Sequence, residues 1–286
     1  MAINKSEWKF LSVVWIAVVI LTFLPVIYGY FSSPSDKVFL FRPNINGGDA
    51  PVYYSYIEQI KSGQFLLKNL FTSEEQPILR FNPFWLLVGL FAKIGNLSSF
   101  FAFHAARFLL IPFLLIVSYQ AIAFFLTEEI QRKICFILFV FASGWGWIIN
   151  FSLENSWRVL DWTVPEAFTF MTIYTEPHFI LSLVLLLLIF LFSFKAFSKH
   201  KLSDSLLTGF FCLILFSFHP YHVYSIFGVL LAFISIDFWL NRKVTMHHLL
   251  HGLILGIFSL PPLLYHVWTL MHIPAAYEHF LQNITL

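Results

Sequence analysis

The stretch Phe10–Tyr30, FLSVVWIAVVILTFLPVIYGY, contains no charged residue. At roughly 20 residues it is long enough for an α-helix to cross the hydrocarbon core of a bilayer. Lys5 and Lys9 precede it, but no cleavage site of small residues follows it. We therefore expect an uncleaved first transmembrane helix here, not a signal peptide.

The composition of the whole chain points the same way. Of its 286 residues, 59% are hydrophobic and 11% are charged, and the mean hydropathy is +0.78. Soluble domains carry roughly 25% charged residues, so water could not wet this surface on all sides. A net charge of +2 without a basic tract argues against a nucleic-acid partner. The composition predicts an all-α integral membrane protein whose first partner is the lipid bilayer.

Further apolar runs of spanning length follow the first one. They lie at 100–126, 134–150, 177–197, 203–218, 221–240 and 247–270. The runs 134–150 and 203–218 are short for a crossing. With no visible repeat or linker, we expect a single membrane domain over 1–286 with about seven transmembrane helices.

Basic residues between the runs predict the orientation. Nine Lys and Arg residues lie in segments 1–9, 127–133, 195–204 and 241–246. Only Arg158 lies in the short segments on the other side, 151–177, 219–222 and 271–286. Because cytoplasmic loops carry the excess of Lys and Arg, we expect a cytoplasmic N-terminus and an exofacial C-terminus.

Residues 31–99 form a large first exofacial loop in this topology. Its apolar piece, Asn82–Gly95, is about 14 residues long and suits an interfacial helix better than a crossing one. Asn82 can cap this helix, Pro83 suits its first turn and Gly95 can end it. A crossing here would turn every basic loop outward, which the positive-inside rule disfavours.

An acidic residue opens a second short helix in the same loop. In the run from Asn46 to Gly63, Asp49 can be the N-cap, Pro51 fits the first turn and Gly63 fits the end. An apolar face follows from Val52, Tyr53, Tyr56, Ile57 and Ile60. Asp49 is either a helix cap or a base that faces a hydroxyl acceptor at the membrane surface.

Other charged groups lie close to the ends of the expected spans. Glu74 and Arg80 lie in the first exofacial loop, and Glu166 and the run Glu176-Pro177-His178 lie in the second. An acid and a histidine at the interface can bind substrate or a divalent cation, whereas a Glu before a helix-starting Pro is also an ordinary partner of the helix dipole.

Two further groups lie on the spans themselves or between them. His104 and Arg107 share one face of the second span, where Arg107 would pair with a lipid phosphate or with an acid such as Glu166. His219 belongs to the run His219-Pro220-Tyr221-His222, which joins two apolar helices. Its histidines are weak candidates for a metal site.

The order of these parts resembles the GT-C glycosyltransferases, which are membrane enzymes that use polyprenyl-phosphate-linked sugars. The protein O-mannosyltransferases and the aminoarabinose transferases of lipid A are examples. The motifs that carry the resemblance are Asp49-x-x-x-Tyr53, Asn69-Leu70-Phe71-Thr72-Ser73-Glu74, Asn82-Pro83-Phe84-Trp85, Val164-Pro165-Glu166-Ala167-Phe168 and His219-Pro220-Tyr221. They look most like uncharacterised bacterial members of the group. In place of an acidic pair common in the family, this chain has Gly48-Asp49, and most members are longer at the C-terminus.

The resemblance implies an inverting sugar transfer on the non-cytoplasmic face of a bacterial plasma membrane. The donor would be a polyprenyl-phosphate sugar and the acceptor a glycan, lipid or protein, with Asp49 as the catalytic base. Residues expected to bind substrate are Tyr53, Glu74, Arg80, Arg107, Glu166, Glu176, His178 and His219. A divalent cation is a possible cofactor.

Two other classes of protein remain open from the sequence. A transporter or flippase would carry ionisable groups at mid-membrane and inverted repeats, whereas the charges here gather near the ends of the runs. A non-catalytic subunit that binds lipid or holds partners would need no base, and the single acid Asp49 is compatible with it.

Overall fold

The computed structural model describes residues 3–41, 48–73, 76, 80–142, 144, 164–242 and 245–272. Within these ranges the regular structure is helical, and the one strand-like pairing is an isolated antiparallel bridge between Leu67 and Arg80. The all-α fold class expected from the composition is therefore confirmed.

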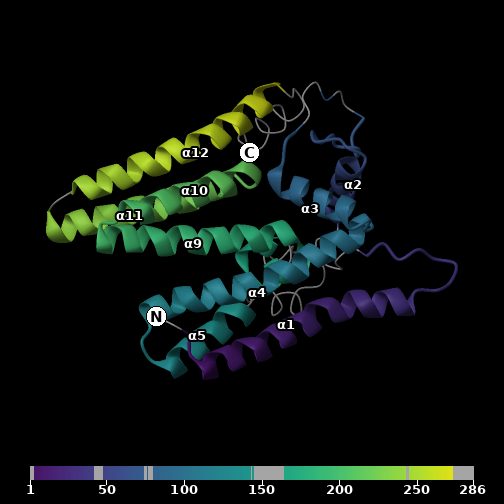
Figure 1. Cartoon of the computed structure of the whole chain (residues 1–286), viewed down its shortest axis with the longest axis horizontal. Helices are drawn as coiled ribbons and strands as arrows, with labels where there is room; N and C mark the ends of the chain where they lie inside the picture. Colours follow the sequence, from purple (N-terminus) through teal and green to yellow (C-terminus); the bar gives the residue numbers. More distant parts are fainter. Residues whose placement is uncertain are drawn as a thin grey trace, which may run out of the picture. The chain divides into compact units, whose positions relative to one another are not determined.

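The helices follow one another along the chain, with the longest connections after α1, α2 and α5 (Figure 1). They are α1 (Lys5–Ser32), α2 (Ala50–Lys61), α3 (Pro83–Ile94), α4 (Ser99–Phe125), α5 (Glu129–Phe141), the 3₁₀ turn η1 (Pro165–Ala167), α8 (Thr169–Thr175), α9 (Pro177–Lys199), α10 (Leu202–Phe218), α11 (His222–Asn241) and α12 (Met246–His272).

Five of these helices are long and apolar enough to cross a membrane, namely α1, α4, α9, α11 and α12. The helix α10 is apolar but has only 17 residues. The run expected at 134–150 begins within α5, and most of its second half lies outside the described residues. Five spanning candidates support an integral membrane protein.

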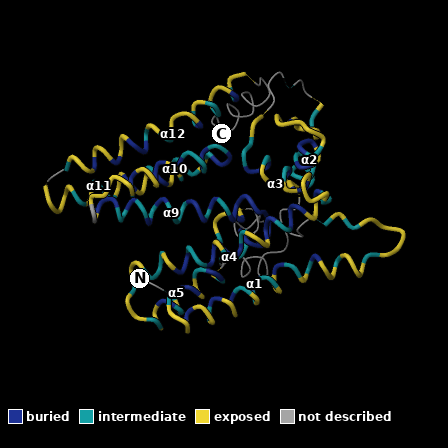
Figure 2. Tube along the Cα trace, in the orientation of Figure 1, coloured by how far each residue is buried: buried dark blue, intermediate teal, exposed yellow. Residues whose placement is uncertain are grey.

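The outer surfaces of these helices carry exposed apolar side chains. Only 11% of the most apolar window of α11 is buried, and its Leu231 and Trp239 are 62% and 67% exposed. Exposed positions recur along α1, α11 and α12 (Figure 2). Water would not tolerate an apolar surface of this extent, whereas hydrocarbon covers it at no cost.

By its internal contacts the chain divides into two compact units, where the sequence predicts one membrane domain. The first unit comprises Met1–Gly63 and Leu87–Val184, and the second comprises Gln64–Leu86 and Leu185–Leu286. The boundaries fall within α3 and α9, so each of these helices contributes residues to both units.

Three helices of the first unit meet at a buried ion pair. The carboxylate of Glu7 on α1 lies 2.7 Å from the guanidinium of Arg132 on α5, and it accepts a hydrogen bond of 2.7 Å from the Tyr119 hydroxyl on α4. Asn4 caps α1 through a reciprocal capping box with Glu7. One carboxylate thus closes the start of α1 and ties it to two neighbours.

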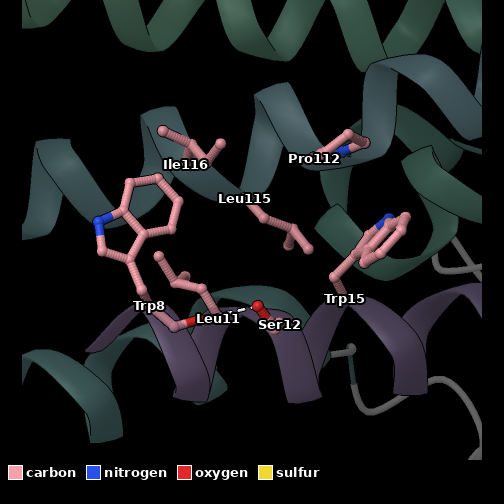
Figure 3. Close-up of a pocket in the computed structure, with 7 residues that line it drawn as sticks. All are labelled: Trp8, Leu11, Ser12, Trp15, Pro112, Leu115 and Ile116. Atoms are coloured by element: carbon pink, nitrogen blue, oxygen red, sulfur yellow. Dashed lines mark hydrogen bonds between the residues drawn. The ribbon is translucent and has the colours of Figure 1, made fainter. Parts of the chain in front are cut away.

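The helices α1 and α4 also enclose a small cavity of about 90 Å³ (Figure 3). The indoles of Trp8 and Trp15 stand on either side of Leu11, and Pro112 and Leu115 face them from α4. The Ser12 hydroxyl donates a hydrogen bond of 2.9 Å to the backbone oxygen of Trp8, so its proton is not available inside the cavity.

The two short helices of the first loop form as the sequence predicts. Asn82 caps α3 by accepting hydrogen bonds from the backbone amides of Phe84 and Trp85 at 3.1 and 3.2 Å. Gly63 follows the end of α2 with a φ of +98°, a conformation that favours glycine. A Cβ at Gly89 of α3 would stand 2.5 Å from Cβ of Ile60, so α2 and α3 approach closely there.

In the second unit, α10 packs along α12 (Figure 1). The approach is again close at a glycine, because a Cβ at Gly209 would lie 2.9 Å from the ring of Phe258. A hydrogen bond of 3.0 Å joins the His251 ring to the Ser205 hydroxyl across the same pair of helices. In addition, the Tyr265 hydroxyl accepts a hydrogen bond of 2.7 Å from the amide of Phe81.

We expect Gly89→Ala to lower the thermal stability of the protein in detergent and to loosen α2. Alanine is intrinsically favoured over glycine in a helix by up to about 1 kcal/mol, but here its methyl group would collide with Ile60. The control is Gly252→Ala on α12, where an added Cβ meets nothing within 4 Å. A melting temperature of Gly89→Ala equal to or above that of the wild type would contradict the close contact between α2 and α3.

Candidate functional site

Asp49 stands at the start of α2 with its side chain available. Its backbone oxygen accepts hydrogen bonds from Val52 and Tyr53 at 2.9 and 3.2 Å, but its carboxylate makes no capping bond. Asp49 is thus the N-cap residue of α2, as the sequence predicts, but its side chain does not make the capping bond. The reason is local, since its φ of −83° and ψ of −25° are helical, whereas a capping side chain needs an extended backbone. The exposed carboxylate is left for other contacts.

Glu176 occupies the junction between α8 and α9, immediately before Pro177. The residue is fully buried, and the Nε2 atom of His178 lies 3.5 Å from its Oε2 atom. Neither carboxyl oxygen of Glu176 accepts a well-aligned hydrogen bond from the described residues. The Tyr53 hydroxyl is nevertheless close enough to interact with this carboxyl group. A buried carboxyl with so little compensation is unstable as an anion.

Asp49, Glu166 and Glu176 form an acidic cluster built from the starts of α2, η1 and α9. Burial raises the pKa of Glu176 to about 8, and the negative charges of Asp49 and Glu166 act in the same direction. Partial burial, with a contribution from Asp49, also raises the pKa of Glu166. The Glu176 side chain is thus mostly neutral at pH 7 and can donate a hydrogen bond, while Asp49 lies at the exposed edge of the cluster.

Tyr53 connects the elements of this cluster. Its ring centroid lies 4.9 Å from that of His178, and burial together with the charges of Glu176 and Asp49 raises the pKa of the Tyr53 hydroxyl. A hydrogen bond of 3.0 Å from the Thr172 hydroxyl to the Pro165 oxygen holds η1 on α8. The structure therefore brings together five of the nine expected site residues, which are Asp49, Tyr53, Glu166, Glu176 and His178.

Arg107 lies inside the first unit and is fully buried. It donates hydrogen bonds of 3.3 Å to the backbone oxygens of Ile173 and Thr22, and a contact of 2.9 Å joins it to Nδ1 of His104. Among the described residues Glu166 is not one of its contacts, so the salt bridge weighed from the sequence is not formed. Backbone carbonyls from α1 and α8 take its place.

The other expected residues belong to the second unit or lie outside the described residues. Arg80 pairs with Leu67 through backbone hydrogen bonds of 2.9 and 2.7 Å in the second unit. His219 of the same unit ends α10 and is buried, which lowers its pKa to about 4. Glu74 lies outside the described residues. In the part of the chain that the structure describes, no group of three or more His, Cys, Asp or Glu side chains could hold a metal ion.

Tyr54 is a residue that sequence reasoning missed. It follows Tyr53 on α2, and its hydroxyl donates a hydrogen bond of 2.7 Å to the backbone oxygen of Phe41. Periodicity placed it off the apolar face of α2, and no local signal points to a partner 13 residues earlier. Its contact links the helix of the acidic cluster to the segment that follows α1.

No known protein family, curated protein or solved structure matches this chain. The class that fold and site define is an all-helical integral membrane protein with five helices fit to cross the bilayer. At the start of one of those helices, α9, the chain gathers three carboxyl groups, a tyrosine and a histidine.

We expect Glu176→Gln to flatten the dependence of stability on pH. Because the pKa of Glu176 in the folded protein, about 8, lies above its ordinary value of 4.5, the folded state holds this proton more tightly. The folded protein is then most stable below pH 4.5. Its free energy of unfolding falls as pH rises from 4.5 to about 8, by at most about 1.4 kcal/mol per pH unit.

The measurement is thermal unfolding of detergent-solubilised wild type and variant between about pH 5 and about pH 9. Glu58→Gln on α2 is the matched control, because Glu58 is exposed and pairs with Lys61 at 3.0 Å. A wild-type curve no steeper than that of Glu176→Gln would contradict a buried neutral Glu176.

Proposed function

We propose that this protein is a membrane glycosyltransferase that moves a sugar from a polyprenyl-phosphate-linked donor to an acceptor on the non-cytoplasmic face. The observation that carries the proposal is the carboxylate of Asp49. It is exposed, it is not used to cap α2, and it lies beside a second carboxyl that burial keeps mostly neutral. The resemblance of the motifs around Asp49, Asn82 and Glu166 to the GT-C enzymes supports the choice of reaction.

In this proposal Asp49 is the general base. It would accept the proton of the acceptor hydroxyl as the acceptor oxygen forms a bond to the anomeric carbon. The bond between that carbon and the donor phosphate oxygen breaks on the opposite side, so the configuration inverts and the lipid phosphate leaves. Removal of a hydroxyl proton by a positioned carboxylate is ordinary general base catalysis.

Protonation of Glu176 supports the same chemistry electrostatically. A donor phosphate is negatively charged, and three ionised carboxylates would repel it from this end of the helices. With Glu176 neutral, the cluster carries less negative charge and repels the donor phosphate less strongly. Tyr53 and His178, which contact each other, would complete the polar wall around the substrate.

A second candidate is a non-catalytic lipid-binding or scaffold subunit. One observation favours it, namely that the guanidinium of Arg107 is fully buried and used by the fold. Arg107 in this arrangement contacts carbonyl oxygens, which leaves the phosphate-binding role expected of it without support. The transfer assay below separates the two candidates.

The proposal includes a topology of seven crossings, with α5 and α10 joining the five longer helices, a cytoplasmic N-terminus and α2 and α3 at the exofacial surface. This topology places Asp49 outside the cytoplasm and all nine clustered basic residues within it, as the positive-inside rule requires.

The topology predicts opposite labelling of two engineered cysteines in a background without Cys135 and Cys212. A membrane-impermeant maleimide should label Asp36→Cys in intact cells and Lys201→Cys only after permeabilisation. Asp36 and Lys201 are both exposed residues of connecting segments, so that access of the reagent depends on the side of the membrane. The reverse pattern would place the acidic cluster in the cytoplasm and remove the proposed reaction.

Asp49→Asn should reduce sugar transfer by at least about 100-fold, since a general base contributes roughly that much or more to the rate. The measurement is transfer of radiolabelled sugar from polyprenyl-phosphate donors in proteoliposomes over a panel of acceptors. Asp36→Asn is the control, because Asp36 is an exposed acid of the same loop. Unchanged transfer by Asp49→Asn would exclude Asp49 as the base, and no transfer by wild type would favour the non-catalytic subunit.

A further inference from the structure

A second and larger cavity lies between α1 and α4. Its volume is about 350 Å³, compared with about 90 Å³ for the cavity of Figure 3. It is lined by Phe23, Val26, Phe41, Phe100, Phe101, His104, Ala105 and Phe108. Five phenylalanine rings thus surround a space that no residue of the acidic cluster reaches.

His104 is the one polar side chain in this lining, and both of its ring nitrogens are used. Arg107 can only donate, so Nδ1 of His104 accepts from it at 2.9 Å. The ring proton of neutral His104 is then on Nε2, which donates to the backbone oxygen of Phe41 at 2.7 Å. A water molecule needs two to four polar partners, and the lining offers none. The cavity therefore suits an apolar occupant.

Phe41, which forms part of the cavity wall, has an unfavourable backbone conformation that its contacts maintain. Phe41 has a φ of +53°, which side chains larger than glycine rarely adopt. Its backbone oxygen accepts from both Tyr54 and His104, at 2.7 Å each, and its ring stacks on Phe100 with centroids 4.5 Å apart. Strain that is sustained by several contacts is a common mark of a functional position.

The position of the cavity identifies the kind of occupant. Both α1 and α4 are long and apolar enough to span, so their outer surfaces face hydrocarbon. Two lining rings, Phe101 and Phe108, are 57% and 39% exposed, which brings the cavity to that surface. If a methylene takes up about as much space as a water molecule, 350 Å³ holds roughly ten methylenes.

We propose that this cavity binds one acyl chain of a bilayer phospholipid. The chain fills space that water cannot, and it supports the ring of Phe41 from within the cavity. Because Tyr54 bonds to Phe41 and is adjacent to Tyr53, chain binding also steadies the helix that carries Asp49. The inference does not depend on sugar transfer, since it follows from the lining and its environment alone.

The test uses photo-crosslinking in proteoliposomes of phosphatidylglycerol and phosphatidylethanolamine that contain a trace of phosphatidylethanolamine with a diazirine on one acyl chain. Mass spectrometry of the peptides should locate labels at residues 23–26 and 100–108. Ala105→Phe, which fills the cavity from α4, should lower labelling there several-fold. Ala232→Phe, at an exposed position of α11, adds the same side chain to a lipid-facing surface and should leave cavity labelling unchanged.

Thermal unfolding accompanies each variant, and Val26→Phe fills the cavity from α1 if Ala105→Phe does not fold. A parallel sample carries a diazirine on an isoprenyl phosphate in place of the phospholipid probe. Equal labelling of wild type and the cavity-filled variant would overturn the proposal, as would labelling of these peptides by the isoprenyl probe alone. Neither outcome bears on the transfer reaction, which is measured separately through Asp49→Asn.

Discussion

The burial of one guanidinium constrains the first unit. A buried cation costs several kcal/mol unless its donors are satisfied, and Arg107 meets this demand through backbone oxygens of Thr22 and Ile173 and the ring of His104. These acceptors belong to α1, α8 and α4, so the three helices must keep one register relative to each other. Because Glu176 follows α8 by one residue, the place of the acidic cluster depends on the same constraint.

Two neighbouring tyrosines of α2 face different environments. Tyr53 meets His178 and the acidic cluster, and Tyr54 bonds to the wall of the apolar cavity. One short helix thus contributes to a polar site and also supports the wall of an apolar cavity. The arrangement is what a membrane protein needs when a charged headgroup and an apolar chain have to be held close to the same surface.

Local sequence signals predicted the local structure well. The long first apolar helix, the helix that Asn82 caps and the turn at Gly63 all follow from composition, capping chemistry and the freedom of glycine, and each is present. The capping role of Asp49 is the exception. The sequence places an acid at the correct position, but whether its side chain turns back to the helix depends on the backbone angles of the segment that leads into α2.

The sequence by itself determined that the chain is an α-helical membrane protein, because hydropathy and charge are sums over residues and need no knowledge of contacts. It also named the three acids of the cluster and the adjoining Tyr53 and His178. Only the tertiary structure decided that Glu176 is the buried acid, that Arg107 is satisfied by carbonyls and that Phe41 borders a cavity. These properties come from contacts between residues far apart in the chain, and burial and pKa depend on such contacts, not on neighbours in sequence.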